Sequence, residues 1–264
     1  MQLIIPDPVS ILDYMPSAYK ILVYGQSGTG KTEFAATWAE AGTLLYMDTS
    51  QGMLTVKSSP RLTHKHNIFF NTIHDIADDP HIKRRIGWDI LKSITESVRD
   101  TGKFGNCTPK TLVLDDLTVG AEYALTCALQ IHNKSPEAEV TQPDWGKQIA
   151  LIRNLINSAR SIKGVNFICL AHEQFVQDKL SGRTWCLPLV TGKYANQVAG
   201  YFDEVYHTKV ESIGGKQQFI MDLRPSGLIG VAKSRFDLPA SVPTHYSSIK
   251  GSLEKLQQKR EVSK

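Results

Sequence analysis

Residues 20–32 read KILVYGQSGTGKT, an apolar run that leads into a glycine-rich turn, and this stretch decides the fold. The turn, Gly25-Gln26-Ser27-Gly28-Thr29-Gly30-Lys31-Thr32, fits the pattern G-x-x-x-x-G-K-[ST] at every defined position. Glycines let such a backbone curl until its N–H groups point at phosphate oxygens, while the lysine reaches the β- and γ-phosphates and the Ser or Thr hydroxyl binds Mg²⁺. The alternative is a glycine-rich turn without a ligand. The pattern, placed between a strand and a helix, predicts a site for a nucleoside triphosphate and Mg²⁺.

Strand and helix patterns alternate around this turn. Short apolar runs predict strands at 20–24, 43–47, 111–114 and 166–170. Helical spacing of apolar residues predicts helices at 31–41, 82–100 and 146–162. Three later runs, separated by Gly- and Pro-containing turns, predict a small antiparallel extension at 203–210, 217–223 and 228–234. The alternation favours an α/β fold with a mostly parallel sheet flanked by helices.

Three parts of the chain differ in character. The proline-containing residues 1–19 predict an extended arm, residues 20–244 the nucleotide-binding domain, and residues 245–264 a basic helix or tail. A solvated helix face is the plain interpretation of that tail. No linker divides the chain into two domains.

The composition excludes several classes of protein. Of 264 residues, 41% are hydrophobic and 21% charged, as in an ordinary globular protein, and the net charge of +4 only weakly favours a polyanionic partner. The four cysteines (Cys107, Cys127, Cys169 and Cys186) are scattered without CxxC or zinc-finger spacing. This pattern argues against a disulfide framework or a structural zinc and favours reduced, cytoplasmic thiols. There is no signal-peptide pattern or long apolar run, so we expect neither secretion nor membrane spanning.

Polar residues follow two of the predicted strands. Asp115 ends the run 111–114 and is expected to hold Mg²⁺ through water, since Mg²⁺ prefers oxygen ligands and keeps several waters. The adjacent Asp116 either orients an attacking water or caps the next helix. His172 follows the strand 166–170, where open α/β sheets bind ligands. It is a candidate for contact with the γ-phosphate, although a lone histidine is more often structural.

Taken together, these segments resemble the RecA-like ATPases, and among them the small phage-type proteins of single-strand annealing and recombination. The likeness covers about residues 19–240, and five stretches carry it: YKILVYGQSGTGKTEFAAT, LYMDTSQG, LVLDDLT, FICLAHEQ and VAKSRFDLP. The resemblance implies that Gly25 to Thr32, Lys31 among them, hold the phosphates of ATP, that Asp115 holds the magnesium water and that His172 contacts the γ-phosphate. It also implies that Lys233 and Arg235 reach the γ-phosphate of an adjoining subunit, which places ATP at the interface of a self-associated protein. The alternative is that these two charges lie on an exposed edge strand.

The resemblance has one departure. Family members usually carry a catalytic Glu after the second strand, where this chain has Ser50. Serine cannot serve as a comparable base, although Gln51 could position a water and Asp116 could take the base role. We therefore expect slow hydrolysis, or nucleotide switching without hydrolysis.

In RecA-like proteins the loops that correspond to residues 132–145 and 173–191 face DNA. The second segment interleaves aromatic and basic residues, a combination that suits single-stranded DNA: Phe175, Lys179, Arg183 and Trp185. The plain alternative is a hairpin with ordinary surface charges.

The preferred interpretation is an ATP-binding, RecA-like ATPase that oligomerises and binds single-stranded DNA in recombination, annealing or replication. A nucleoside kinase is less favoured because it needs an arginine-rich lid, and residues 117–165 contain only Arg153 and Arg160. A non-hydrolysing nucleotide-binding scaffold is the third class, favoured by Ser50.

Overall fold

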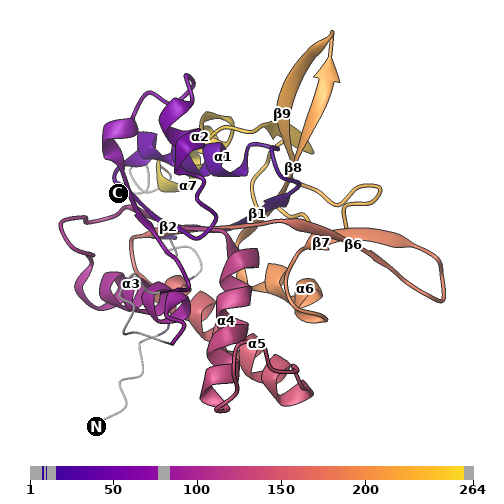
Figure 1. Ribbon diagram of the computed structural model, residues 1–264. Coiled ribbons are helices and arrows are strands. Elements are labelled where there is room, and N and C mark those ends of the chain that lie inside the picture. Colours follow the sequence, from indigo (N-terminus) through magenta and orange to yellow (C-terminus); the bar gives the residue numbers. More distant parts are fainter. Residues whose placement is uncertain (1–7, 9, 11–15, 77–83, 259–264) are drawn as a thin grey trace.

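The computed structural model describes residues 8, 10, 16–76 and 84–258, and its centre is a mostly parallel sheet of eight strands (Figure 1). The strands lie in the order β10 (Ser241–Pro243), β9 (Lys216–Asp222), β8 (Glu204–Ile213), β1 (Lys20–Gly25), β5 (Asn166–Ala171), β4 (Thr111–Asp115), β2 (Leu44–Asp48) and β3 (Ile68–Thr72). All neighbours from β8 to β3 pair in parallel, whereas β9 and β10 are antiparallel. The parallel strands therefore end at one edge, where a ligand site is expected.

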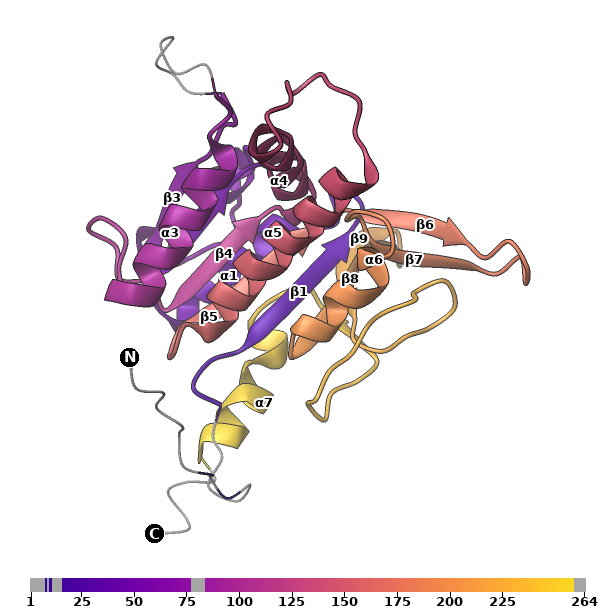
Figure 2. The same cartoon turned by 90° about the horizontal axis from the view of Figure 1, so that it is seen from below.

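Helices cover both faces of the sheet. One face carries α3 (Gly87–Thr101), α4 (Leu117–Ile131), α5 (Gln142–Ser161) and the short α6 (Tyr194–Gln197); the other carries α1 (Lys31–Thr37), α2 (Met53–Ser58) and α7 (Ser247–Gln258), as Figures 1 and 2 show. Side chains of a strand alternate between the two layers. In β1, Leu22 and Tyr24 enter the core beneath α3 to α5, while Ile21 and Val23 enter the core beneath α1 and α7. This double burial explains why the strands read as continuous apolar runs.

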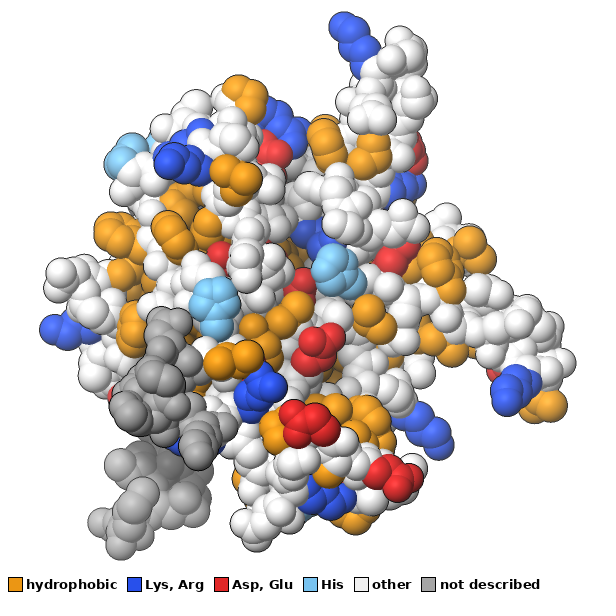
Figure 3. Space-filling model, in the orientation of Figure 1, with side chains coloured by type: hydrophobic (Ala, Val, Ile, Leu, Met, Phe, Trp, Pro, Cys, Tyr) orange, Lys and Arg blue, Asp and Glu red, His pale blue; other side chains and the backbone are white. Residues whose placement is uncertain are grey.

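Two hairpins project from this body. One is β8–β9, and the other is the separate two-stranded sheet of β6 (Glu173–Gln177) and β7 (Thr184–Pro188). Figure 3 shows Lys or Arg side chains at both tips. The exposed residues there include Lys179 and Arg183 on one hairpin and Lys216 on the other. In the described part of the chain no helix combines the length and the apolar character needed to cross a bilayer.

The fold class is confirmed, and the predicted strands of the parallel sheet form. The helix predicted at 31–41 is α1 followed by a 3-10 turn at Trp38–Ala41. The helix predicted at 146–162 begins earlier, at Gln142, because Thr141 and Asp144 form a capping box there. Residues 82 and 83 of another predicted helix lie outside the described residues, as do most of the arm at 1–19 and all of 259–264.

The strand predicted at 228–234 is wrong. Only isolated bridges occur there, between Cys186 and Ile229, between Ser226 and Ile229 and between Val205 and Lys233. Gly230 lies close against β7: its N–H donates to the Cys186 carbonyl oxygen at 3.0 Å, and a Cβ at this position would lie 3.1 Å from that oxygen. The segment therefore runs along β7 and β8 as a loop.

Candidate functional site

The phosphate loop connects β1 to α1 and depends on its glycines. Gly28 and Gly30 have φ angles of 77° and 88°, in the left-handed region that favours glycine. Gly25 is constrained differently: a Cβ there would lie 2.4 Å from both the carbonyl and the hydroxyl oxygen of Thr208 in β8. The loop is thus shaped by its own backbone and by contact with the neighbouring strand.

Lys31 lies across the curled loop. Its Nζ donates hydrogen bonds to the carbonyl oxygens of Gly25, at 2.8 Å, and Gln26, at 2.7 Å. Burial lowers the pKa of this ammonium group, and the nearby Asp116 and Asp115 carboxylates counteract the effect. A buried cation held only by carbonyl groups is well placed to bind the oxygens of a phosphate.

Asp115 ends β4 beside Thr32. The carboxylate is buried, its Oδ1 accepts a hydrogen bond from Ser50 Oγ at 3.1 Å, and its Oδ2 has no hydrogen-bond partner among the described residues. Burial raises the pKa of Asp115 from 3.8 to about 6; the neighbouring Thr32 and Ser50 hydroxyls partly offset this rise, whereas the Asp116 and Asp48 carboxylates add to it. A buried carboxylate oxygen without a donor next to a threonine hydroxyl fits Mg²⁺ and its waters.

Asp116 begins α4 and makes two contacts. Its Oδ1 accepts from the Val119 N–H at 2.8 Å, which caps the helix, and its Oδ2 lies 3.1 Å from His172 Nε2. Thr49 holds the backbone from the other side, because its hydroxyl accepts from the Asp116 N–H at 2.7 Å. Asp116 therefore caps the helix, one of the two roles considered for it, and also orients His172.

Lys31, Asp115 and His172 line one cavity of about 340 Å³ at the carboxyl edge of the sheet. The cavity brings together the phosphate loop, Asp115, Asp116 and His172, and Gln51 lies at its rim with a φ of 60°. Sequence reasoning missed Thr49, whose place directly after β2 is the only signal that could have pointed to it.

Lys233 and Arg235 do not line this cavity. Lys233 pairs through its backbone with Val205 near the start of β8, and the exposed Arg235 lies 3.4 Å from Asp203. Val205 is three residues before Thr208, the residue that contacts the phosphate loop. The two cations thus lie toward the amino ends of the parallel strands, whereas the phosphate loop of the same chain lies at their carboxyl ends.

The structure does not bring the four predicted DNA-contacting residues onto one surface. Lys179 and Arg183 lie at the tip of the β6–β7 hairpin, but Phe175 and Trp185 fall on opposite faces. Phe175 pairs across the hairpin with Cys186, whereas Trp185 pairs with Val176. The Arg183 guanidinium lies over the Trp185 ring, 5.3 Å from its centroid. Strand alternation separates the aromatic residues that the sequence placed together.

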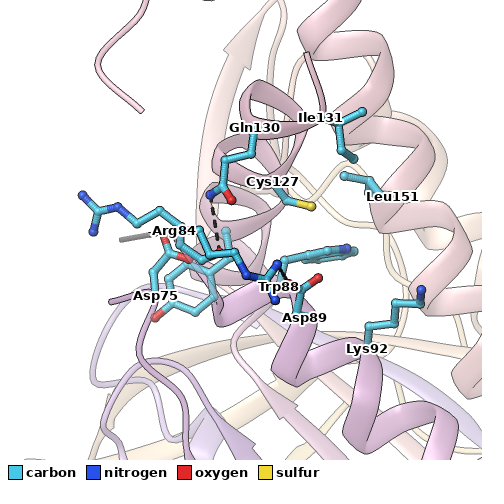
Figure 4. A pocket seen from close by; sticks show the side chains of 11 residues that line it. Asp75, Arg84, Trp88, Asp89, Lys92, Cys127, Gln130, Ile131 and Leu151 are labelled. Atoms are coloured by element: carbon cyan, nitrogen blue, oxygen red, sulfur yellow. Dashed lines mark hydrogen bonds and ion pairs between the residues drawn. The ribbon is translucent and has the colours of Figure 1, made fainter. Parts of the chain in front are cut away.

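A second cavity, of about 380 Å³, lies among α3, α4 and α5 (Figure 4). An ion pair between Arg84 and Asp89, at 2.6 Å, closes one side of it, and Trp88 and Leu151 line the interior. It contains none of the predicted site residues. Of the predicted site residues, those expected to act on the triphosphate and Mg²⁺ lie together in the cavity at the phosphate loop.

Known structures and one protein-family model are similar to this chain over most of its length. Two solved structures are similar to this chain, each at 14% identity. The flagellar accessory protein FlaH from Methanocaldococcus jannaschii has a TM-score of 0.41, and the match covers 83% of this chain and 84% of FlaH. The RadB recombinase has a TM-score of 0.43, and the match covers 81% of this chain and 86% of RadB. No curated protein matches. A family model described as an AAA domain matches residues 17–236, which include every element of the phosphate site. The chain therefore belongs to this AAA domain family.

Proposed function

We propose that this protein is an ATP-binding, slowly hydrolysing ATPase that binds single-stranded DNA. One observation carries the nucleotide part: Lys31, Thr32, Asp115 and His172 come from three separate segments and line the same small cavity. Each supplies the chemistry that a Mg²⁺–triphosphate needs, namely a cation, a hydroxyl, a carboxylate and a polar group near the last phosphate.

Slow hydrolysis is inferred from the groups near the expected water. Ser50 uses its hydroxyl to bind Asp115, and a serine is a poor base. Asp116 has both carboxylate oxygens engaged, by α4 and by His172. We expect turnover below about 1 s⁻¹ without an activating partner. A non-hydrolysing nucleotide-binding scaffold is the second candidate, and the same Ser50 contact favours it.

The DNA part is supported by the β6–β7 hairpin and by the resemblance to RecA-like proteins. Exposed Phe175, Lys179 and Arg183 offer a stacking face and two cations on a projecting element. A role in phage-type annealing, recombination or replication is the corresponding biological setting. Lys233 and Arg235, directed away from their own phosphate loop, are proposed to contact ATP bound by a neighbouring subunit.

The test is ATP binding and hydrolysis with and without single-stranded DNA, for the wild type, Lys31→Ala and Lys57→Ala. Lys57 is an exposed lysine of α2 and serves as the matched control. DNA-stimulated turnover that is lost only in Lys31→Ala supports the proposal. Tight ATP binding without turnover in either condition favours the scaffold, and ATP binding that survives in Lys31→Ala contradicts the assigned site.

DNA binding has its own test in the variant Lys179→Ala/Arg183→Ala. Removing two phosphate contacts from a single-strand site should reduce the slope of log affinity against log salt by about 1.4. An unchanged affinity and slope would remove the hairpin from the DNA interface while leaving the nucleotide site untouched.

A further inference from the structure

Beside the phosphate loop, three side chains of different chemistry converge from three strands. Glu173 begins β6, Cys186 lies in β7 and His207 lies in β8. One ligand atom of each lies within 4.8 Å of the others, the only such group of three among the described residues. Glu173 Oε2 is 2.7 Å from His207 Nε2 and 3.2 Å from Cys186 Sγ, and the sulfur lies 3.7 Å from the same nitrogen. All three side chains are largely buried.

The fold brings these three residues together, although their spacing along the chain does not indicate a common site. Glu173 and Cys186 are 13 residues apart, and Cys186 and His207 are 21 apart. Neither spacing belongs to a zinc-binding motif, which is why the sequence argued against zinc. Cross-strand pairing in the β6–β7 hairpin turns both Glu173 and Cys186 toward β8, where His207 faces them.

The donor set and its dimensions suit zinc. Nitrogen, sulfur and carboxylate oxygen are the protein ligands of Zn²⁺, and its bond lengths of about 2.0–2.3 Å give edges of about 3.4–3.6 Å in a tetrahedral site. The sulfur–nitrogen distance of 3.7 Å is already close to such an edge. The two distances to Glu173 Oε2 are shorter, so only this carboxylate has to move outward, by less than about 1 Å, to admit the ion.

The second nitrogen of His207 is placed as in a histidine that ligates a metal through Nε2. His207 Nδ1 is buried without a hydrogen-bond partner among the described residues and faces the Asp222 carboxylate at 3.7 Å. If a neutral His207 donates its Nε2 proton to Glu173, then Nδ1 directs a lone pair at a second carboxylate. A metal ion on Nε2 removes that conflict, because the proton then lies on Nδ1 and points at Asp222, as in carboxylate–histidine–zinc arrangements.

We infer that Glu173, Cys186 and His207 form a Zn²⁺ site whose fourth position opens to a cavity. That cavity measures about 380 Å³ and is lined by the three ligands together with Ser27 and Thr29 of the phosphate loop. A water molecule completes the coordination there. The ion joins the β6–β7 hairpin to β8, and the site requires neither ATP nor DNA.

The experiment is a titration of the metal-free, nucleotide-free full chain with Co²⁺, followed by absorbance. One equivalent of Co²⁺ should produce a thiolate-to-cobalt charge-transfer band, and Zn²⁺ should displace it. Cys186→Ser and His207→Gln should lose the band. Cys127→Ser should keep it, because Cys127 is a half-buried cysteine of α4 outside the cluster. Asp222→Asn should keep the band but bind Co²⁺ about 10- to 100-fold more weakly.

Two results would overturn the inference: a wild type that binds Co²⁺ without a thiolate band or does not bind it, and a band that persists in Cys186→Ser. The wild-type titration decides even if a variant fails to fold. Thermal unfolding adds an independent measurement, since Zn²⁺ should raise the Tm of the wild type and of Cys127→Ser and leave that of His207→Gln unchanged.

Discussion

Replacing Asp115 by Asn should stabilise the nucleotide-free protein, and the gain should depend on pH. A carboxyl group whose pKa rises from 3.8 to about 6 on folding is costly to ionise. At about 1.4 kcal/mol per pH unit, the ionised form costs about 3 kcal/mol of stability above pH 6. As the pH falls toward 3.8 the group becomes protonated in the folded state and the cost disappears. Linkage leaves roughly half of that cost at pH 5.

The measurement is urea unfolding of the wild type, Asp115→Asn and Asp237→Asn at pH 8 and pH 5, with a chelator present. Asp237 is an exposed carboxylate and serves as the control. The buried amide can itself lose about 1–2 kcal/mol through imperfect hydrogen bonding, but that loss is the same at both pH values. The advantage of Asp115→Asn should therefore be larger at pH 8 than at pH 5 by about 1–2 kcal/mol. An advantage that does not change with pH would refute the assignment of a costly buried charge to Asp115.

Three further predictions concern the stability of the fold. Gly25→Ala should destabilise the protein by about 1–3 kcal/mol in urea unfolding, because the added Cβ would lie 2.4 Å from Thr208 oxygens. The control is Gly146→Ala, in a helix with open space around it, which should be neutral or stabilise the protein by up to about 1 kcal/mol. Asp116→Ala should cost about 1 kcal/mol through loss of the α4 cap, and an unchanged stability would contradict that role. Hydrogen bonds from His132, Lys134 and Thr141 lower the pKa of Asp144, so Asp144→Asn should lower the Tm at pH 7, and the deficit should shrink as the pH falls below 3.8.

The parallel sheet could be predicted because each strand is buried on both faces and reads as an unbroken apolar run. Strands that are not buried on both faces were harder to recognise. β3 has the sequence IFFNT, with Phe69 and Phe70 exposed, and β6 begins with the polar pair Glu173 and Gln174. Such short segments lack the double burial that makes a run continuous, so periodicity does not separate them from loops.

The phosphate site could be predicted because its residues follow strand ends, and parallel strands end at one edge of the sheet. The position of Asp116 was predictable, but its partner was not: the contact with His172 depends on β4 and β5 being neighbours. For Phe175 and Trp185, by contrast, the sequence predicted a shared surface that the fold does not form. They are close in sequence, yet the hairpin register places them on opposite faces.

Consecutive residues connect the phosphate cavity to the proposed metal site. His172 contacts Asp116 in the phosphate cavity, and the next residue, Glu173, contacts His207 in the cluster. β8 provides a second connection, because Thr208 follows His207 and its hydroxyl lies 2.7 Å from that of Thr29 in the phosphate loop. A γ-phosphate that draws His172 away from Asp116 would therefore also pull on Glu173 at the base of the β6–β7 hairpin. An ion bound at the cluster would resist that movement, because it fixes Glu173 to β8. On this arrangement the occupancy of the metal site sets how strongly the hairpin responds to nucleotide.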